Sequence, residues 1–234
     1  MQLSQPMRAK HIGYAKLSSL DFILEDNDTI PADKGIFLNN TRRLNKKICN
    51  YISSSFYDSR LTSDPITKTR SVNLKLDPIK DEGLFYVPIE HSGCSQRSDE
   101  EADLIEKTYN KIINKEFKVD KNSGKITPKD IMVVAPYNAQ ANNIRERLKK
   151  KFKDDVRVGT IDLFQGQEAK VVLISMTTSD VESLPRHKDF FFSRNRLNVA
   201  ISRAECVAII IFNENLLLAS INSIKEMKLM NSFC

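Results

Sequence analysis

Six short runs of apolar residues are spread along the chain, and they are too uniformly apolar to be strands with one face in water. A strand exposed on one side alternates apolar and polar residues, whereas a strand covered on both faces is apolar throughout. We therefore expect the six runs to be strands that are buried on both faces. They cover residues 36–38, 84–89, 131–137, 156–161, 171–176 and 206–212.

Between these runs lie segments with the spacing of amphipathic helices. They cover residues 44–55, 99–117, 138–151, 195–204 and a C-terminal pair that follows the last run. Ser98, followed three residues later by Glu101, matches a capping box and predicts where the second of these helices begins. Alternating strands and helices predict an α/β fold of three layers, α/β/α, built on a mainly parallel sheet.

Two polar segments interrupt this alternation. Residues 62–82 carry two prolines among polar residues, which predicts a surface loop or insertion. Residues 119–128, VDKNSGKITP, predict a second surface segment whose tip is a hairpin or turn. A chain of 234 residues is long enough to bury a sizeable core, and we treat residues 1–234 as one domain.

Composition narrows the class of protein only moderately. Lysines and arginines (36) outnumber aspartates and glutamates (30), so the net charge of +6 favours an anionic partner. The four cysteines form no C-x-x-C pair, which argues against zinc or dithiol redox chemistry, and we predict no metal site. No apolar stretch reaches the roughly 20 residues of a membrane span, and the N-terminus lacks a signal-peptide pattern. We therefore expect a cytoplasmic protein without a membrane partner.

The segment 194–205, RNRLNVAISRAE, places three arginines on one predicted helix just before the last apolar run. Arg196 and Arg203 are seven residues apart and share one stripe of that helix. The apolar stripe, which would be buried, consists of Leu197, Ala200, Ile201 and Ala204. Two solvated arginines are the usual outcome on an arbitrary helix, so a binding role depends on the neighbouring segments.

Three other loops follow predicted strands. The loop DLFQGQEA contains Gly166, which permits a tight turn, and Glu168, which could accept hydrogen bonds from a ribose. Arg42 and Arg43 follow the first apolar run, and the third loop contains Tyr137, which is placed to meet a nucleic-acid backbone. Because the carboxyl ends of parallel strands share one edge of a sheet, we expect these groups to gather at that edge. Most lysines of the helix at 138–151 are more simply read as a solvated face.

Together these segments resemble the second RecA-like motor domain of superfamily 1 helicases. The resemblance is closer to the subgroup that contains the nonsense-mediated-decay RNA helicase and the Dna2-type nuclease-helicases. IDLFQGQE matches its motif V, NRLNVAISRA its motif VI, and VVAPYNAQ its "PYxxQ" segment. LNNTRRLNKKICNYISSSFY matches the segment that contains "QYR", and MQLSQP resembles the tail of motif III, so residues 1–35 would be a linker from that motif. The resemblance spans nearly the whole chain and implies a RecA-like fold of the P-loop NTPase class.

The resemblance also implies catalytic residues. In such motors ATP lies between two RecA-like domains, and the second domain supplies arginines to the γ-phosphate. Arg203 matches the arginine finger of motif VI, and Arg43 matches a second γ-phosphate contact. Gln2 matches the motif III glutamine that senses the γ-phosphate or the attacking water. We therefore expect the guanidinium groups of Arg43 and Arg203 to reach one shared phosphate.

Further nucleotide and nucleic-acid contacts follow from the same resemblance. Glu168 matches a glutamate that meets the nucleotide sugar, and Arg42 stands where the subgroup usually has a tyrosine that stacks on adenine. A guanidinium plane can also stack on a base. Gly166 and Arg196 complete the predicted nucleotide-binding set. The predicted nucleic-acid contacts are Thr160, Pro136, Tyr137, Asn138 and Gln140.

The sequence contains no G-x-x-x-x-G-K-[ST] motif and no acidic Walker B pair before Gln2. We therefore expect ATP and Mg²⁺ to be held mainly by an N-terminal RecA-like domain of the same polypeptide, absent from this chain, and the chain alone to be inactive as an ATPase. The parent protein would be an ATP-dependent helicase on single-stranded nucleic acid, with DNA favoured over RNA and 5′ to 3′ movement. Bacterial look-alikes add a RecB-like nuclease domain as a candidate partner.

Two other hypotheses stay open at this stage. The chain could be a non-catalytic nucleic-acid or protein-binding module derived from a helicase domain. Tight binding of single strands without any partner domain would favour that hypothesis. The chain could also be a complete nucleotide-binding enzyme, which the missing P-loop disfavours and which ATPase activity of residues 1–234 would support.

Overall fold

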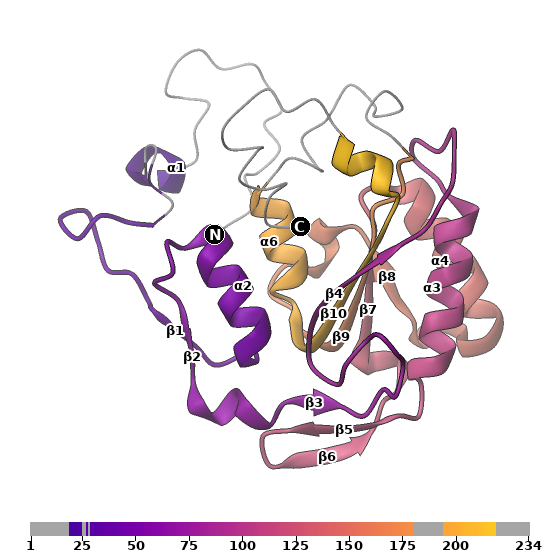
Figure 1. The fold of residues 1–234 in the computed structure, drawn as a ribbon, viewed down its shortest axis with the longest axis horizontal. Helices are drawn as coiled ribbons and strands as arrows, with labels where there is room; N and C mark the ends of the chain where they lie inside the picture. The colour runs from indigo at the N-terminus through magenta and orange to yellow at the C-terminus, as the bar shows by residue number, and fades with distance from the viewer. Residues whose placement is uncertain (1–18, 25–26, 28, 180–193, 219–234) are drawn as a thin grey trace.

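The computed structural model describes residues 19–24, 27, 29–179 and 194–218 (Figure 1). Its centre is a five-stranded sheet with the strand order β4-β10-β9-β7-β8, in which every neighbouring pair is parallel. These strands are β4 (Gly83–Pro88), β7 (Ile131–Val134), β8 (Arg157–Gly159), β9 (Ala169–Ser175) and β10 (Ala204–Phe212). Five of the six predicted strands are confirmed.

Helices cover both faces of this sheet in the part of the chain that the structure describes. Helices α2 (Lys46–Phe56) and α6 (Arg194–Ile201) lie on one face, and α3 (Asp99–Ile112) and α4 (Asn138–Phe152) lie on the other (Figure 1). Successive strand residues alternate between the two cores: Ile209 packs with α3 and α4, and Ile210 packs with α2 and α6. Both side chains are buried, and β10 is apolar from Cys206 to Phe212 because this part of the strand has two dry faces. The three-layer α/β/α fold is confirmed.

A buried asparagine fixes the start of α2 to the central sheet. The Oδ1 atom of Asn45 accepts the N–H of Ile48 at 2.9 Å, which caps the helix. The side-chain amide of Asn45 donates to the carbonyl of Cys206 on β10. One side chain therefore sets both where α2 begins and where that end of the helix meets the sheet.

The apolar run at 36–38 is not a strand, contrary to the sequence prediction. Ile36 and Leu38 are 88% and 82% exposed. The chain pairs only after them, where β1 (Asn40–Thr41) lies parallel to β2 (Thr62–Ser63). A run of three residues carries too little apolar surface to require burial on two faces, and the edge of the central sheet is formed by β4 instead.

Residues 62–82 were predicted to be a surface loop or an insertion, and the loop prediction is wrong in part, because the segment combines exposed residues with short regular elements and buried side chains. They contain β2, the 3-10 helix η2 (Pro65–Thr69) and β3 (Ser71–Val72), and the side chains of Val72 and Leu74 are fully buried. Apolar residues at 72, 74 and 76 alternate with polar residues, the pattern of a segment with one buried face, and this signal was missed among the charges.

The predicted hairpin near residues 119–128 is confirmed. Strand β5 (Glu116–Val119) pairs antiparallel with β6 (Asn122–Lys125), and β3 pairs antiparallel with the other side of β5. Figure 1 shows this small sheet beneath the end of the central sheet at which β9 and β10 begin. Helix α3 ends at Ile112, earlier than predicted, because the chain is needed to form β5.

The remaining elements are short. They are α1 (Ser19–Leu24) and the 3-10 helices η3 (Pro128–Asp130), η4 (Lys153–Asp155), η5 (Ile161–Phe164) and η6 (Glu214–Leu218). Of the C-terminal helical pair predicted after the last strand, only η6 falls within the described residues. Gln2 and most of the predicted 1–35 linker also lie outside them. No helix within the described ranges is long and apolar enough to cross a membrane.

The dual role of Asn45 gives a stability prediction. Asn45→Ala removes the cap of α2 and leaves the Cys206 carbonyl without its partner in a buried position, so we expect the free energy of unfolding to fall by about 2–3 kcal/mol. Urea denaturation of the chain measures this. Asn50→Ala, at an exposed position of the same helix, is the matched control and should change stability by less than about 0.5 kcal/mol. Equal effects of the two substitutions would contradict the role given to Asn45.

Candidate nucleotide-binding site

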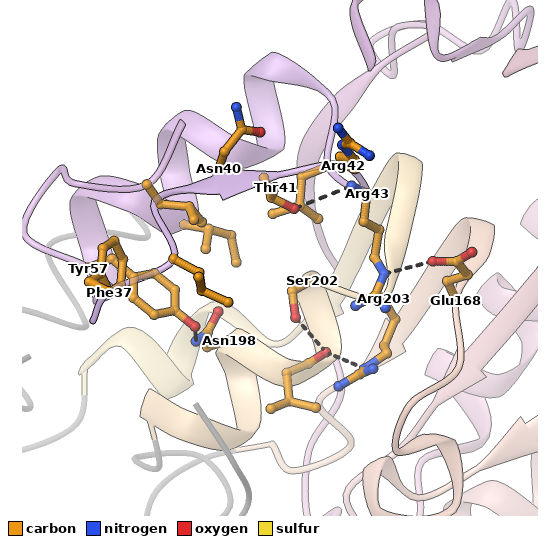
Figure 2. Close-up of a pocket in the computed structure, with 15 residues that line it drawn as sticks. Phe37, Asn40, Thr41, Arg42, Arg43, Tyr57, Glu168, Asn198, Ser202 and Arg203 are labelled. Atoms are coloured by element: carbon orange, nitrogen blue, oxygen red, sulfur yellow. Dashed lines mark hydrogen bonds and ion pairs between the residues drawn. The ribbon is translucent and has the colours of Figure 1, made fainter. Parts of the chain in front are cut away.

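Arg43, Glu168 and Arg203 converge on one cavity although they are far apart in the sequence (Figure 2). Glu168 directly precedes β9, and Arg203 directly precedes β10. The N–H of Ala169 donates to the carbonyl of Arg203 at 3.0 Å, which brings the starts of the two strands together. Arg43 reaches the same place because the start of α2 is fixed to β10 through Asn45.

These residues lie at the amino edge of the sheet, which corrects the sequence prediction of the carboxyl edge. Glu168 and Arg203 come before their strands, whereas Thr160 and Tyr137 come after β8 and β7. Helix η5 lies on the connection that returns the chain from the carboxyl end of β8 to the amino end of β9, a crossing that loop composition alone does not reveal. The predicted site residues therefore form two sets at opposite edges.

The cavity at the amino edge has a volume of 660 Å³. Among the described residues that line it are three arginines and one acid. Its lining consists of Phe37, Leu38, Asn40, Thr41, Arg42, Arg43, Leu44, Ile52, Tyr57, Leu61, Glu168, Asn198, Val199, Ser202 and Arg203. The excess of guanidinium groups makes the cavity suited to an anion with several oxygens.

Arg43 is held by an ion pair with Glu168. The Nε atom of Arg43 lies 2.8 Å from Oε2 of Glu168, and the two side chains are 33% and 53% exposed. The backbone N–H of Arg43 donates to Oγ1 of Thr41 at 3.3 Å. An ion pair this exposed contributes little to stability, so an anion of higher charge can exchange with the carboxylate at little cost.

Arg203 is held more firmly, by backbone carbonyls. Its Nε donates to the carbonyl of Val199 at 3.2 Å, and its Nη1 donates to the carbonyl of Gln167 at 3.1 Å. Burial lowers the pKa of the Arg203 guanidinium from its ordinary value, and the charge of Arg43 lowers it further, while Glu168 opposes this. A guanidinium stays protonated in proteins, so two positive charges are held side by side at this wall of the cavity (Figure 2).

The described lining residues at the opposite end of the cavity are uncharged, and two of them are aromatic. The rings of Phe37 and Tyr57 lie 5.8 Å apart, and the side-chain amide of Asn198 donates to the hydroxyl of Tyr57 at 3.1 Å. These three residues were not predicted as site residues, because Phe37 was assigned to a buried strand, Tyr57 follows the predicted helix at 44–55, and Asn198 lies inside the predicted helix at 195–204. An aromatic wall beside amide groups can contact a planar base.

Two other predicted nucleotide contacts are placed differently. Arg42 lines the cavity, but its side chain is 86% exposed and lies 3.3 Å from Asp64. Arg196 is not among the described residues of the lining, and its Nη1 lies 3.5 Å from Asp162. Helix α6 ends at Ile201, so Arg203 lies beyond the helix. The prediction that Arg196 and Arg203 share one stripe of a helix is therefore wrong. All four residues of the predicted apolar stripe are buried, but Ala204 begins β10 and is not part of α6.

Gly166 behaves as expected of a turn residue. Its φ is +80°, in the region that side-chain-bearing residues avoid, and a Cβ there would meet nothing within 4 Å. The backbone conformation therefore accounts for the glycine, without a close contact.

The second set of predicted residues lies at the carboxyl edge, and only part of it is accessible. Thr160 is the N-cap of η5 and is partly exposed, Tyr137 is half-buried, and Asn138 is exposed at the start of α4. Pro136, in contrast, is buried. The accessible groups are thus confined to the loops that follow β7 and β8.

Gln140 is a structural residue, which corrects its assignment to nucleic-acid binding. Its side chain is fully buried, and Oε1 accepts the N–H of Ser98 at 2.9 Å. Its Nε2 donates to the carbonyl of Ser98 at 3.0 Å and to Oγ of Ser175 at 3.2 Å. These bonds fix the start of α3 to the end of β9, so the amide is not available to a nucleic-acid strand.

A buried carboxylate completes this carboxyl-edge network. The N–H of Glu101 donates to Oγ of Ser98 at 3.1 Å, so the predicted N-cap is confirmed. The carboxylate does not return to Ser98 but accepts the N–H of Thr177 at 2.9 Å and lies 3.2 Å from Nε2 of His91. A fully buried carboxylate needs several such partners, which explains why the reciprocal half of the capping box is not formed.

A family model with the description "AAA domain" matches residues 18–215. The chain belongs to this AAA-domain family. It is 28% identical over 189 residues to the DNA polymerase alpha-associated DNA helicase A of Saccharomyces cerevisiae, a match covering 76% of this chain and 27% of the relative. It is 31% identical over 196 residues to an ATP-dependent helicase of Methanocaldococcus jannaschii, covering 75% and 26%. The RNA helicase Mov10l1 of Mus musculus is 36% identical over 98 residues, 41% of this chain and 8% of the relative.

The AAA domain spans about a quarter of the length of the first two of these relatives. Its cavity fits one part of ATP, since guanidinium groups suit phosphate oxygens. The described residues that line this cavity include neither a glycine-rich phosphate loop nor the hydroxyl that such a loop presents to Mg²⁺. Within the described ranges of the AAA domain, no group of three or more His, Cys, Asp or Glu residues could hold a metal ion.

The structural role of Gln140 in the AAA domain is testable. Gln140→Leu keeps the volume but leaves the buried N–H of Ser98 without its acceptor and removes the two hydrogen bonds that the amide donates, so we expect the free energy of unfolding to fall by about 2–3 kcal/mol. Urea denaturation measures this. Gln165→Leu, in an exposed loop, is the control and should shift stability by less than about 0.5 kcal/mol. A Gln140→Leu variant as stable as the control would show that the amide is not structural.

Proposed function

We propose that this AAA domain is the second motor domain of an ATP-dependent superfamily 1 helicase. In this proposal it supplies arginines to ATP that is held by an N-terminal RecA-like domain of the same polypeptide. The observation that carries the proposal is the convergence of Arg43 and Arg203 on one cavity, from segments far apart in the sequence. The relatives support the class of activity, because they are named as helicases.

Arg203 acts as the arginine finger in this proposal. Its Nε and Nη1 are directed at the carbonyls of Val199 and Gln167, so the guanidinium keeps one orientation before any phosphate arrives. A donor that is oriented in advance stabilises charge that develops on the γ-phosphate without the cost of reorganisation. Mg²⁺, bound with ATP to the other domain, would neutralise further charge on the phosphates.

Arg43 and Glu168 exchange partners in this proposal. In the structure, the carboxylate of Glu168 forms an ion pair with the guanidinium of Arg43. A γ-phosphate carries more charge than a carboxylate and would take that guanidinium, which frees Glu168 to accept hydrogen bonds from the hydroxyls of the nucleotide sugar. Arg42, at the same cavity, has the reach and exposure to stack on the base.

The track is single-stranded nucleic acid at the carboxyl edge, with Thr160, Tyr137 and Asn138 as the accessible contacts. We favour DNA and 5′ to 3′ movement, both from the resemblance to nuclease-linked helicases, and a RecB-like nuclease domain as a further partner. The relatives include helicases named for DNA and for RNA, so DNA rests on the resemblance alone. Nucleotide and strand would thus bind at opposite edges of one sheet.

The role of Arg203 can be tested by substitution in the full-length protein. We expect Arg203→Ala to reduce ATP turnover by about 10³-fold or more, the usual loss on removal of an arginine finger. Lys150→Ala, an exposed position on α4 across the sheet from the cavity, is the charge-matched control and should keep wild-type turnover. Near-normal turnover of Arg203→Ala would end the arginine-finger assignment.

The division of labour between two domains gives a second prediction. Purified residues 1–234 should show no ATP hydrolysis above background, because the phosphates and Mg²⁺ have no P-loop to hold them. A coupled phosphate-release assay, with and without single-stranded DNA, measures this. Turnover by residues 1–234 that is abolished by Arg203→Ala would instead identify a complete enzyme.

A further inference from the structure

Arg70 is a buried arginine that the proposed mechanism does not use. It follows η2, in the segment that the sequence predicted to be a surface loop, and it is only 6% exposed. Its Nε and Nη2 each lie 2.8 Å from one carboxylate oxygen of Asp120. Its Nη1 donates to the backbone carbonyl of Arg43 at 2.5 Å and lies 3.5 Å from Oε1 of Glu205. All three nitrogens are therefore used.

The partner carboxylate is presented by the turn of the small sheet. Asp120 follows β5 and has a φ of +56°, so the hairpin turn projects it toward Arg70. The hydrogen bond from Arg70 lowers the pKa of Asp120, and the bond to Asp120 raises the pKa of Arg70 against the effect of burial. A bidentate arginine–carboxylate contact fixes the orientation of the two side chains as well as the distance between them.

Arg70 contacts the backbone of Arg43 and the side chain of Glu205, a residue close to Arg203 in the sequence. Its bond to the carbonyl of Arg43 fixes the turn from which that side chain departs. Glu205 is two residues after Arg203, at the start of β10. A buried guanidinium is costly, and apolar residues can stabilise a fold as well as a buried ion pair does, so we ascribe the arginine to the fixed geometry of its contacts.

We propose that Arg70 and Asp120 form a clamp that positions Arg43, and through Glu205 the start of β10, so that Arg43 and Arg203 reach the same triphosphate. This rests on the proposed function. Arg70 is a positioning residue, since the groups that it touches are Asp120, Glu205 and the Arg43 carbonyl. The proposal also gives the small sheet of β3, β5 and β6 a purpose, which is to brace the amino edge of the central sheet (Figure 1).

The test uses the full-length protein and the substitution Arg70→Lys. Lysine keeps the charge and the ion pair with Asp120, but a single ammonium cannot also hold the carbonyl of Arg43 in the geometry of the fork. We expect kcat for ATP hydrolysis to fall at least about tenfold, since a misplacement of 1 Å costs about 10²-fold, while KM changes by less than about threefold. Asp120→Asn, which is nearly isosteric, should show the same fall in kcat with little change in KM. It replaces Arg70→Lys in the test if that variant does not fold.

A matched control separates positioning from general stability. Arg147 also contacts two acids, Asp99 and Asp103, and joins α4 to α3 on the other side of the sheet, but both acids are more than half exposed. Arg147→Lys should lower the melting temperature only slightly and leave kcat unchanged. If Arg70→Lys also lowers only the melting temperature, the clamp merely stabilises the small sheet and the inference is wrong.

A double-mutant cycle tests whether Arg70 acts through Arg43. In an Arg43→Ala background, Arg70→Lys should reduce kcat by clearly less than it does in the wild type, because part of its effect passes through the missing side chain. Full additivity would overturn the inference. Arg203→Ala in the same assay keeps the two proposals distinguishable. If Arg203→Ala keeps wild-type turnover, the proposed function is refuted. If Arg203→Ala loses turnover but Arg70→Lys has no effect, only the clamp is refuted.

Discussion

The main constraint on the candidate site is that two positive charges, those of Arg43 and Arg203, are held at one cavity. Arg43 and Arg203 repel each other, and the repulsion is tolerated because Glu168 lies against one guanidinium and backbone carbonyls hold the other. The parallel pairing of β9 and β10 places Glu168 and Arg203 side by side, and the Asn45 bond to β10 brings Arg43 to them. A polyanion bound at this cavity would relieve the repulsion, in line with the proposed function.

The two edges of the central sheet are built differently, and the difference suits two tasks. The amino edge places the exposed Arg42, the partly exposed Arg43 and the buried Arg203 around one cavity. At the carboxyl edge, Gln140 and Glu101 lock the start of α3 to the end of β9 with fully buried polar groups. Strand β9 spans the distance between the edges as one element of a sheet with two dry faces. A nucleotide bound at one edge and a nucleic-acid strand bound at the other would therefore be linked by a rigid body.

The sequence predicted the core layers well because apolar patterns report burial, which is a local property. The runs at 131–137 and 206–212 are strands since each needs two dry faces. Local patterns do not report which edge of a sheet a loop returns to, so Glu168 was assigned to the wrong edge. Local patterns also do not show hydrogen-bond partners. Gln140 was therefore predicted to contact a nucleic-acid strand, whereas its amide is hydrogen-bonded inside the fold.

The central claim is that Arg43 and Arg203 reach the same phosphate, and a crystal structure of the full-length protein with ADP and aluminium fluoride tests it most directly. The fluoride complex stands in for the γ-phosphoryl group during transfer. The account predicts that both guanidinium groups lie within hydrogen-bonding distance of it, about 3 Å, and that Glu168 has left Arg43. A complex in which the Arg43–Glu168 ion pair persists and Arg203 remains turned away from the fluorides would contradict it.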